Sequence, residues 1–172
     1  MSQRIKENHN IVIRSIENGD WPKVWQILAP VFKQGTTYAF ALDLTESRAK
    51  DLWVNNNLET FVAEGSDGEI LGTFYLKANF AGNADHICNC GYVVAENARG
   101  RGVARQMCIE SQRIALTKGF RAMQFNFVVS TNQGAISLWQ KLGFHIVGTL
   151  PEAFRHPDAG IVDAHIMFKS LI

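Results

Sequence analysis

The chain has few cysteines, no long apolar run and almost no net charge, and each shortage excludes a class of protein. Three cysteines, two of them in Cys88-x-Cys90, provide neither a disulfide framework nor a zinc-binding spacing. We expect these two to pack in the core from one face of a strand. A formal charge of +1 gives no reason to expect a nucleic acid or a membrane as a partner. No signal peptide or transmembrane run is visible, so we expect a cytoplasmic protein.

The length of 172 residues predicts a single domain over residues 1–172, with a polar and loosely ordered segment at 1–10. Asp20 and Thr45 are expected to cap the first two helices, and Gly119 is expected to end a third helix that begins near Val103. A fourth helix is expected from Asn132 to Gly143. Strands are expected at Ile11–Ile13, Phe61–Glu64, Ile70–Lys77, His86–Val94, Met123–Val129, Phe144–Gly148 and Ile161–Phe168.

This order predicts a mixed α+β fold with long antiparallel strand runs and helices packed on the sheet. Within the strand Met123–Val129, alternation places four apolar side chains on one face: Met123, Phe125, Phe127 and Val129. Between the last two strands, Pro151–Gly160 is expected to form a long loop.

The stretch Asn89–Ala104 combines an apolar strand, a basic loop with two glycines and the start of a helix. Glycines let backbone N–H groups approach a ligand closely, and a helix N-terminus adds partial positive charge. Arg99 and Arg101 add two full charges. The stretch therefore predicts a site for a phosphate or a pyrophosphate.

Two sequence motifs narrow the choice of ligand. The loop lacks the Gly-Lys-Ser/Thr of a Walker A motif and the third glycine of G-x-G-x-x-G. It matches Arg-x-x-Gly-x-Ala over Arg99–Ala104, and Asn132–Phe144 reads Asn-x-x-Ala-x-x-Leu-Trp-x-x-x-Gly-Phe. The two motifs, in this order and spacing, resemble the GNAT superfamily of N-acetyltransferases. The resemblance is close over about Phe61–Phe168.

The resemblance implies a mostly antiparallel central sheet, splayed between the fourth and fifth strands, with helices on both faces. It also implies acetyl-CoA as the co-substrate, with no metal ion. The pantetheine arm would lie in the splay, and the loop would hold the pyrophosphate. The cofactor-binding candidates are Tyr92, Val93, Val94, Arg99, Gly100, Arg101, Gly102, Val103, Ala104, Asn132 and Trp139.

Catalysis requires a polarised thioester carbonyl, an unprotonated amine and a proton for the thiolate. We expect the backbone N–H of Val93 to stabilise the oxyanion. Trp139 stands where the family usually has a tyrosine acid, and an indole N–H is far too weak an acid for that role. Trp139 also falls on the apolar stripe of its helix, which favours a core role over a catalytic one. Glu64 and His86 are the candidate bases by residue type and by position on the sheet, although both also fit as sheet-edge residues.

Four residues are candidates for substrate binding: Asn89, Asn126, Tyr38 and Tyr75. A neutral amide offers both a donor and an acceptor, which suits an amino-acid-like ligand. The runs Asn89–Tyr92 and Phe125–Asn132 also look like those of fungal acetyltransferases that act on proline analogues, although Cys90 departs from the alanine expected there. The resemblance thus favours direct acetyl transfer to a small amine in a ternary complex.

Two alternatives remain open at this point. One is a catalytically silent domain that binds or senses acyl-CoA, which the tryptophan at Trp139 would support. The other is an acetyltransferase for protein N-termini or lysines, which predicts an open, acidic peptide groove. A homodimer is also possible, because homodimers are common in the family.

Overall fold

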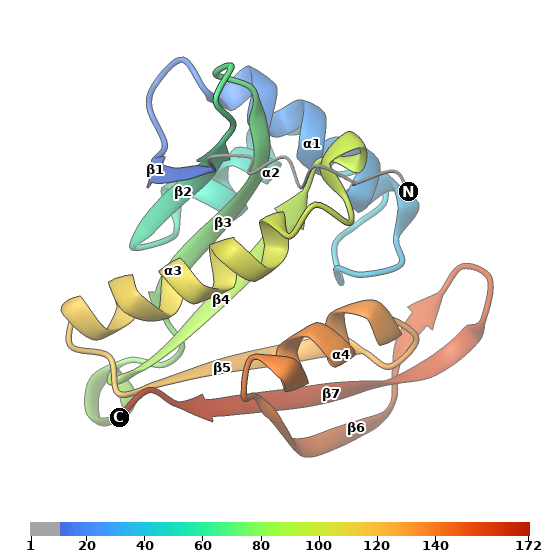
Figure 1. Cartoon of the computed structure of the whole chain (residues 1–172). Coiled ribbons are helices and arrows are strands. Elements are labelled where there is room, and N and C mark those ends of the chain that lie inside the picture. The colour runs from blue at the N-terminus through green and yellow to red at the C-terminus, as the bar shows by residue number, and fades with distance from the viewer. Residues whose placement is uncertain (1–10) are drawn as a thin grey trace, which may run out of the picture.

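The structure is a computed structural model, and it describes residues 11–172. The expectation for residues 1–10 falls outside this range. A seven-stranded sheet runs in the order β1-β2-β3-β4-β5-β7-β6, antiparallel except between β4 and β5 (Figure 1). The strands are β1 Val12–Ser15, β2 Glu59–Glu64, β3 Ile70–Ala78, β4 Ile87–Val94, β5 Ala122–Val129, β6 His145–His156 and β7 Gly160–Ser170. The mixed α+β fold is therefore confirmed.

Helices cover both faces of this sheet, as expected. On one face α1 (Trp21–Gln34) and α2 (Glu46–Lys50), which continues into the π-helical turn η1 (Asp51–Asn55), enclose a core that includes Trp53. On the other face α3 (Val103–Thr117) and α4 (Gln133–Lys141) enclose a larger core. Short 3-10 turns, η2 (Gly82–Ala84) and η3 (Glu96–Ala98), lie on either side of β4.

The two parallel strands β4 and β5 are paired only where they begin. Their register consists of Ile87 opposite Ala122 and Cys88 opposite Met123. One residue later the side chain of Asn89 spans the gap, because its Nδ2 donates to the carbonyl oxygen of Gln124 at 2.8 Å. Beyond this point the strands diverge, and Figure 1 shows β4 turning away from β5. The expected splay between the fourth and fifth strands is confirmed.

The expectation of a loop over Pro151–Gly160 is wrong. β6 extends to His156 and pairs with β7, so the connection to Gly160 is short and the two strands form a long hairpin. Pro151 is tolerated in β6 because β6 is an edge strand, and because its register with β7 shifts between Leu150 and Phe154. Glu152, within this shift, has a φ of 52°.

A second irregularity corrects the faces assigned along β5. Its register with β7 shifts between Phe125 and Val128, so Val128, and not Phe127, joins Phe125 in the core. Phe127 instead packs against Phe154 of the long hairpin, with ring centroids 6.0 Å apart. An extra residue in a strand reverses the inward and outward alternation of the side chains that follow it. β5 contains no glycine or proline that would have indicated this shift.

Of the three residues predicted to mark helix ends, two do so and one does not. Thr45 caps α2 through its side chain, which accepts from the N–H of Arg48, and Gly119 follows α3 with a φ of 89°. Both expectations are confirmed. Asp20 precedes α1 but makes no side-chain cap, so that expectation is wrong. Its carboxylate is instead held by the guanidinium of Arg14 and by the N–H of Glu17.

Candidate active site

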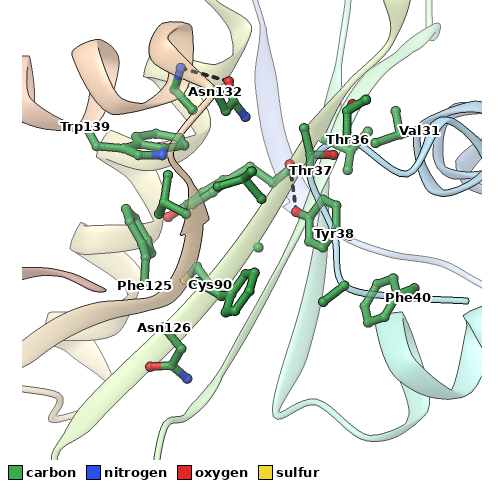
Figure 2. Close-up of a pocket in the computed structure, with 18 of the residues that line it drawn as sticks. Val31, Thr36, Thr37, Tyr38, Phe40, Cys90, Phe125, Asn126, Asn132 and Trp139 are labelled. Carbon is green, nitrogen blue, oxygen red and sulfur yellow. Dashed lines mark hydrogen bonds between the residues drawn. The ribbon is translucent and has the colours of Figure 1, made fainter. Parts of the chain in front are cut away.

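A cavity of about 680 Å³ occupies the splay between β4 and β5. Its walls come from β3, β4 and β5, from the N-terminal part of α4, and from the segment Thr36–Phe40 that follows α1. Figure 2 shows Tyr38 and Phe40 on one side of β4, with Phe125, Asn126, Asn132 and Trp139 on the other. The cavity thus joins segments that lie about 100 residues apart in the sequence.

The hydrogen bonds between β3 and β4 determine which backbone groups of β4 point into the splay. At one end of its ladder with β3 the N–H of Ala95 donates to Leu71, and at the other the carbonyl of Ile87 accepts from Asn79. With no register shift between these bonds, odd-numbered residues of β4 direct their N–H and C=O groups to β3. Even-numbered residues therefore direct theirs into the splay: Cys90, Tyr92 and Val94.

This alternation contradicts the expectation that the backbone N–H of Val93 stabilises the oxyanion. Its N–H is directed toward Thr73, its partner on β3, and so it does not point at the cavity. The side chain of Val93 still lines the cavity from the α1 side. The backbone groups of Tyr92 and Val94, two of the predicted cofactor contacts, are the ones that the ladder leaves open, together with those of Cys90.

The basic loop lies where β4 ends and α3 begins. Gly100 and Gly102 have φ angles of 75° and 82°, which only glycine adopts without strain, and Gly102 is the N-cap of α3. The first four N–H groups of a helix have no acceptor within it, so Val103 and Ala104 present free donors. Arg99 lines the cavity, and Arg101, two residues further along the loop, is exposed. This arrangement fits a diphosphate.

Asn132 and Trp139 close the cavity from α4. Asn132 caps the helix, because its Oδ1 accepts from the N–H of Ala135 at 3.2 Å, and this leaves its Nδ2 for another partner (Figure 2). Trp139 has a relative exposure of 8% and packs on Tyr92 and Phe125, with centroid distances of 5.1 and 5.2 Å. Trp139 is therefore a core residue and a cavity residue at once.

On the α1 side, two tyrosines face the cavity with their hydroxyl groups engaged. The hydroxyl of Tyr38 donates to the carbonyl of Tyr92 at 3.0 Å, on the open edge of β4. The hydroxyl of Tyr75 donates to Oδ1 of Asn89 at 3.2 Å. Burial raises the pKa of Tyr38 and that of Tyr75 above their usual values. Both hydroxyls are thus protonated at neutral pH and act as donors.

The amides predicted to bind substrate already have protein partners. Asn89 is buried, with its Oδ1 on Tyr75 and its Nδ2 on Gln124. Asn126 is exposed to the cavity, donates to Asn79 at 2.6 Å and accepts from Gln124 at 2.8 Å. Asn89 therefore shapes the pocket, whereas Asn126 can exchange its partners for a ligand.

Neither candidate base reaches the cavity. Glu64 is bonded to Arg14 at the far edge of the sheet, between β1 and β2. His86 is exposed at the closed end of the splay, where its carbonyl accepts from the N–H of Arg121 at 2.8 Å. The described lining contains no carboxylate and no imidazole, and Arg99 and Lys77 are its two charged side chains.

Lys77 is the charged cavity residue that sequence reasoning missed. It closes the expected strand Ile70–Lys77, and its alternation with Tyr75 was the one signal that could have found it. Within residues 11–172 no three side chains among His, Cys, Asp and Glu are grouped so as to hold a metal ion. No helix in that part of the chain is long and apolar enough to cross a membrane.

Comparisons with known proteins agree with this geometry. A family model described as the acetyltransferase (GNAT) family matches residues 14–144. N-acetyltransferase aca1 of Schizosaccharomyces pombe is 30% identical over 150 residues, which cover 78% of this chain and 72% of that protein.

Solved structures extend the likeness to almost the whole chain. A GCN5-related N-acetyltransferase from Kribbella flavida is 40% identical, with a TM-score of 0.88 over 93% of this chain and 97% of its own. A GNAT superfamily phosphinothricin acetyltransferase from Sinorhizobium meliloti, solved in complex with AcCoA, shares the fold at 18% identity, with a TM-score of 0.82 over 93% and 88% of the two chains. The chain belongs to the GNAT family of acetyltransferases.

Proposed function

We propose that this protein transfers the acetyl group of acetyl-CoA directly to the amine of a small, amino-acid-like molecule. The observation that carries the proposal is the cavity in the splay. It brings the open edge of β4 together with Arg99, which begins the loop leading to α3, and with a chamber lined by tyrosines and amides. One continuous space would thus hold the co-substrate at one end and the acceptor at the other.

The chain's own groups fit the parts of acetyl-CoA in order. Arg99 and the N–H groups of Gly102, Val103 and Ala104 would hold the pyrophosphate. The N–H and C=O groups of Val94, which the ladder with β3 leaves open, would bind the pantetheine amides as an added strand does, with the Nδ2 of Asn132 facing them from α4. Acetyl-CoA supplies the activated acyl group as a thioester.

The chamber on the α1 side supports a small acceptor. Tyr38 and Tyr75 give it apolar surface and hydroxyl oxygens that can accept a hydrogen bond, and Asn126, from the β5 side of the cavity, offers an amide that can accept and donate. Because the described lining carries no carboxylate, it lacks the acidic groove that a basic peptide substrate would require. The same absence argues against a lysine side chain as the acceptor.

The chamber also favours the reactive form of the amine. Partial removal from water in the cavity and the nearby cation of Lys77 both disfavour an ammonium ion, so they would lower the pKa of a bound amine. The free amine then attacks the thioester carbonyl carbon, and an open N–H of β4, such as that of Tyr92, is placed to stabilise the oxyanion. When the intermediate collapses, the C–S bond breaks, and the proton lost by the amine passes to the thiolate, directly or through water.

The experiment is to measure CoA release with acetyl-CoA and a panel of amino acids, and to confirm the acetylated product by mass spectrometry. Asn126→Ala should lower kcat/KM for the amine by about 10-fold, the effect of one hydrogen bond of about 1.4 kcal/mol, and leave acetyl-CoA binding unchanged. Asn83→Ala, an exposed asparagine outside the cavity lining, is the matched control. Tight acetyl-CoA binding without turnover of any amine would instead establish a silent acyl-CoA-binding domain.

A further inference from the structure

One cation lies at the acceptor end of the cavity. Lys77 is half-buried on β3, opposite Asn89, and lines the cavity where the splay begins. The other charged residue of the described lining, Arg99, lies beyond the far end of β4, at the loop that fits the pyrophosphate. The two cations thus mark opposite ends of one space.

Within the part of the chain that the structure describes, no carboxylate pairs with the ammonium group of Lys77, although Lys118 and Arg14 each bind a glutamate. Its Nζ lies 5.3 Å from the centre of the Tyr75 ring. An aromatic face orients a cation without neutralising it, so the charge of Lys77 stays available to a ligand.

The position of the Lys77 ammonium group limits how far apart the anion and the amine of a bound acceptor can be. The ring of Tyr75 covers Gly91, since an added Cβ there would lie 2.6 Å from its Cε1. The ammonium group lies 5.3 Å from the centre of that ring, and Lys77 itself is paired with Asn89, three residues or roughly 10 Å along the strand from Tyr92 and its open N–H. A molecule with an anion and an amine a few bonds apart fits this spacing.

We propose that Lys77 binds the carboxylate of the acceptor, so that the substrate class is free amino acids. This rests on the proposed function and names the acceptor for the same site. A carboxylate held by Lys77 orients the amine toward the open edge of β4, and the amide of Asn126 borders the same end of the cavity. Lys77 both attracts the acid group and repels a protonated amine from its own position.

The test compares each amino acid that is acetylated with its carboxamide and its decarboxylated amine. Wild-type protein should prefer the acid by about 10- to 100-fold in kcat/KM, the usual worth of a hydrogen bond to a charged group. Lys77→Met should remove most of that preference by lowering kcat/KM for the acid far more than kcat/KM for the carboxamide, and should leave the KM for acetyl-CoA unchanged. Lys33→Met, an exposed lysine outside the cavity lining, is the matched control.

The outcomes separate this inference from the proposed function. Equal turnover of acid, carboxamide and amine by the wild type, or an unchanged preference in Lys77→Met, would overturn the role of Lys77 and leave acetyl transfer intact. If no amine is acetylated, calorimetric titration of the amino acids into CoA-saturated protein decides. Binding that is lost in Lys77→Met supports the carboxylate site, and the absence of binding overturns it together with the proposed acceptor.

Discussion

Replacing Gly91 with alanine is the sharpest test of how the acceptor chamber is packed. The new Cβ would lie 2.6 Å from Cε1 and 3.0 Å from the hydroxyl oxygen of Tyr75. The ring is held from another side by Trp53, with centroids 5.0 Å apart, and by its bond to Asn89 at 3.2 Å. It must therefore move by roughly 1 Å against packed neighbours, an overpacking that costs about 1–3 kcal/mol. Loss of the hydroxyl bond adds about 1 kcal/mol.

The two contributions predict that Gly91→Ala lowers the free energy of unfolding by about 2–4 kcal/mol, or the Tm by about 5–12 °C. The displaced ring should also raise the KM for the amine more than that for acetyl-CoA. The measurements are urea denaturation and steady-state kinetics, with Gly19→Ala as the control, since a Cβ at Gly19 meets no atom within 4 Å. In a Tyr75→Leu background the same substitution should cost much less. A loss below 0.5 kcal/mol in the wild-type background would refute this packing.

Three further predictions concern the loop, the acid limb of stability and a buried thiol. Gly102→Ala should cost about 1–2 kcal/mol in urea denaturation, because its φ of 82° strains any other residue while its Cβ would meet open space. The bond to Arg14 holds the pKa of Asp20 below its usual value, so this carboxylate stabilises the fold fully at neutral pH and progressively less as the pH falls below about 4. The loss in free energy of unfolding caused by Asp20→Asn, measured by urea denaturation, should therefore be smaller at pH 3 than at pH 7. Burial raises the pKa of Cys108 to about 11, so its alkylation by iodoacetamide at pH 7.5, followed by mass spectrometry, should proceed only on unfolding.

Elements with a local chemical cause could be predicted from the sequence. Thr45 and Gly119 mark helix ends because a hydroxyl cap and a positive φ are properties of single residues. The loop at Gly100 and Gly102 was predicted for the same reason. The splay was a different case, because it followed from the likeness of two motifs to a known family and not from residue patterns.

Elements that depend on distant partners could not be predicted. Pro151 suggests a loop in isolation, and it lies in a strand only because β6 is an edge whose missing donor costs nothing. The role of Val93 depended on which parity of β4 faces β3, and a strand's sequence does not encode that phase. Lys77 drew no attention because a lysine at a strand end is ordinary until the fold encloses it.

The hydrogen bonds of one side chain, that of Asn89, determine where the splay between β4 and β5 begins. Asn89 follows the last paired residue of β4, and its amide extends the parallel ladder by one step through Gln124 while its other end holds Tyr75. Strands joined at one end diverge by their twist, so the residue that ends the pairing also fixes where the opening starts. The acceptor chamber and the co-substrate groove share this origin. A change at Asn89 therefore acts on both at once, whereas Lys77 and Arg99 each act at one end.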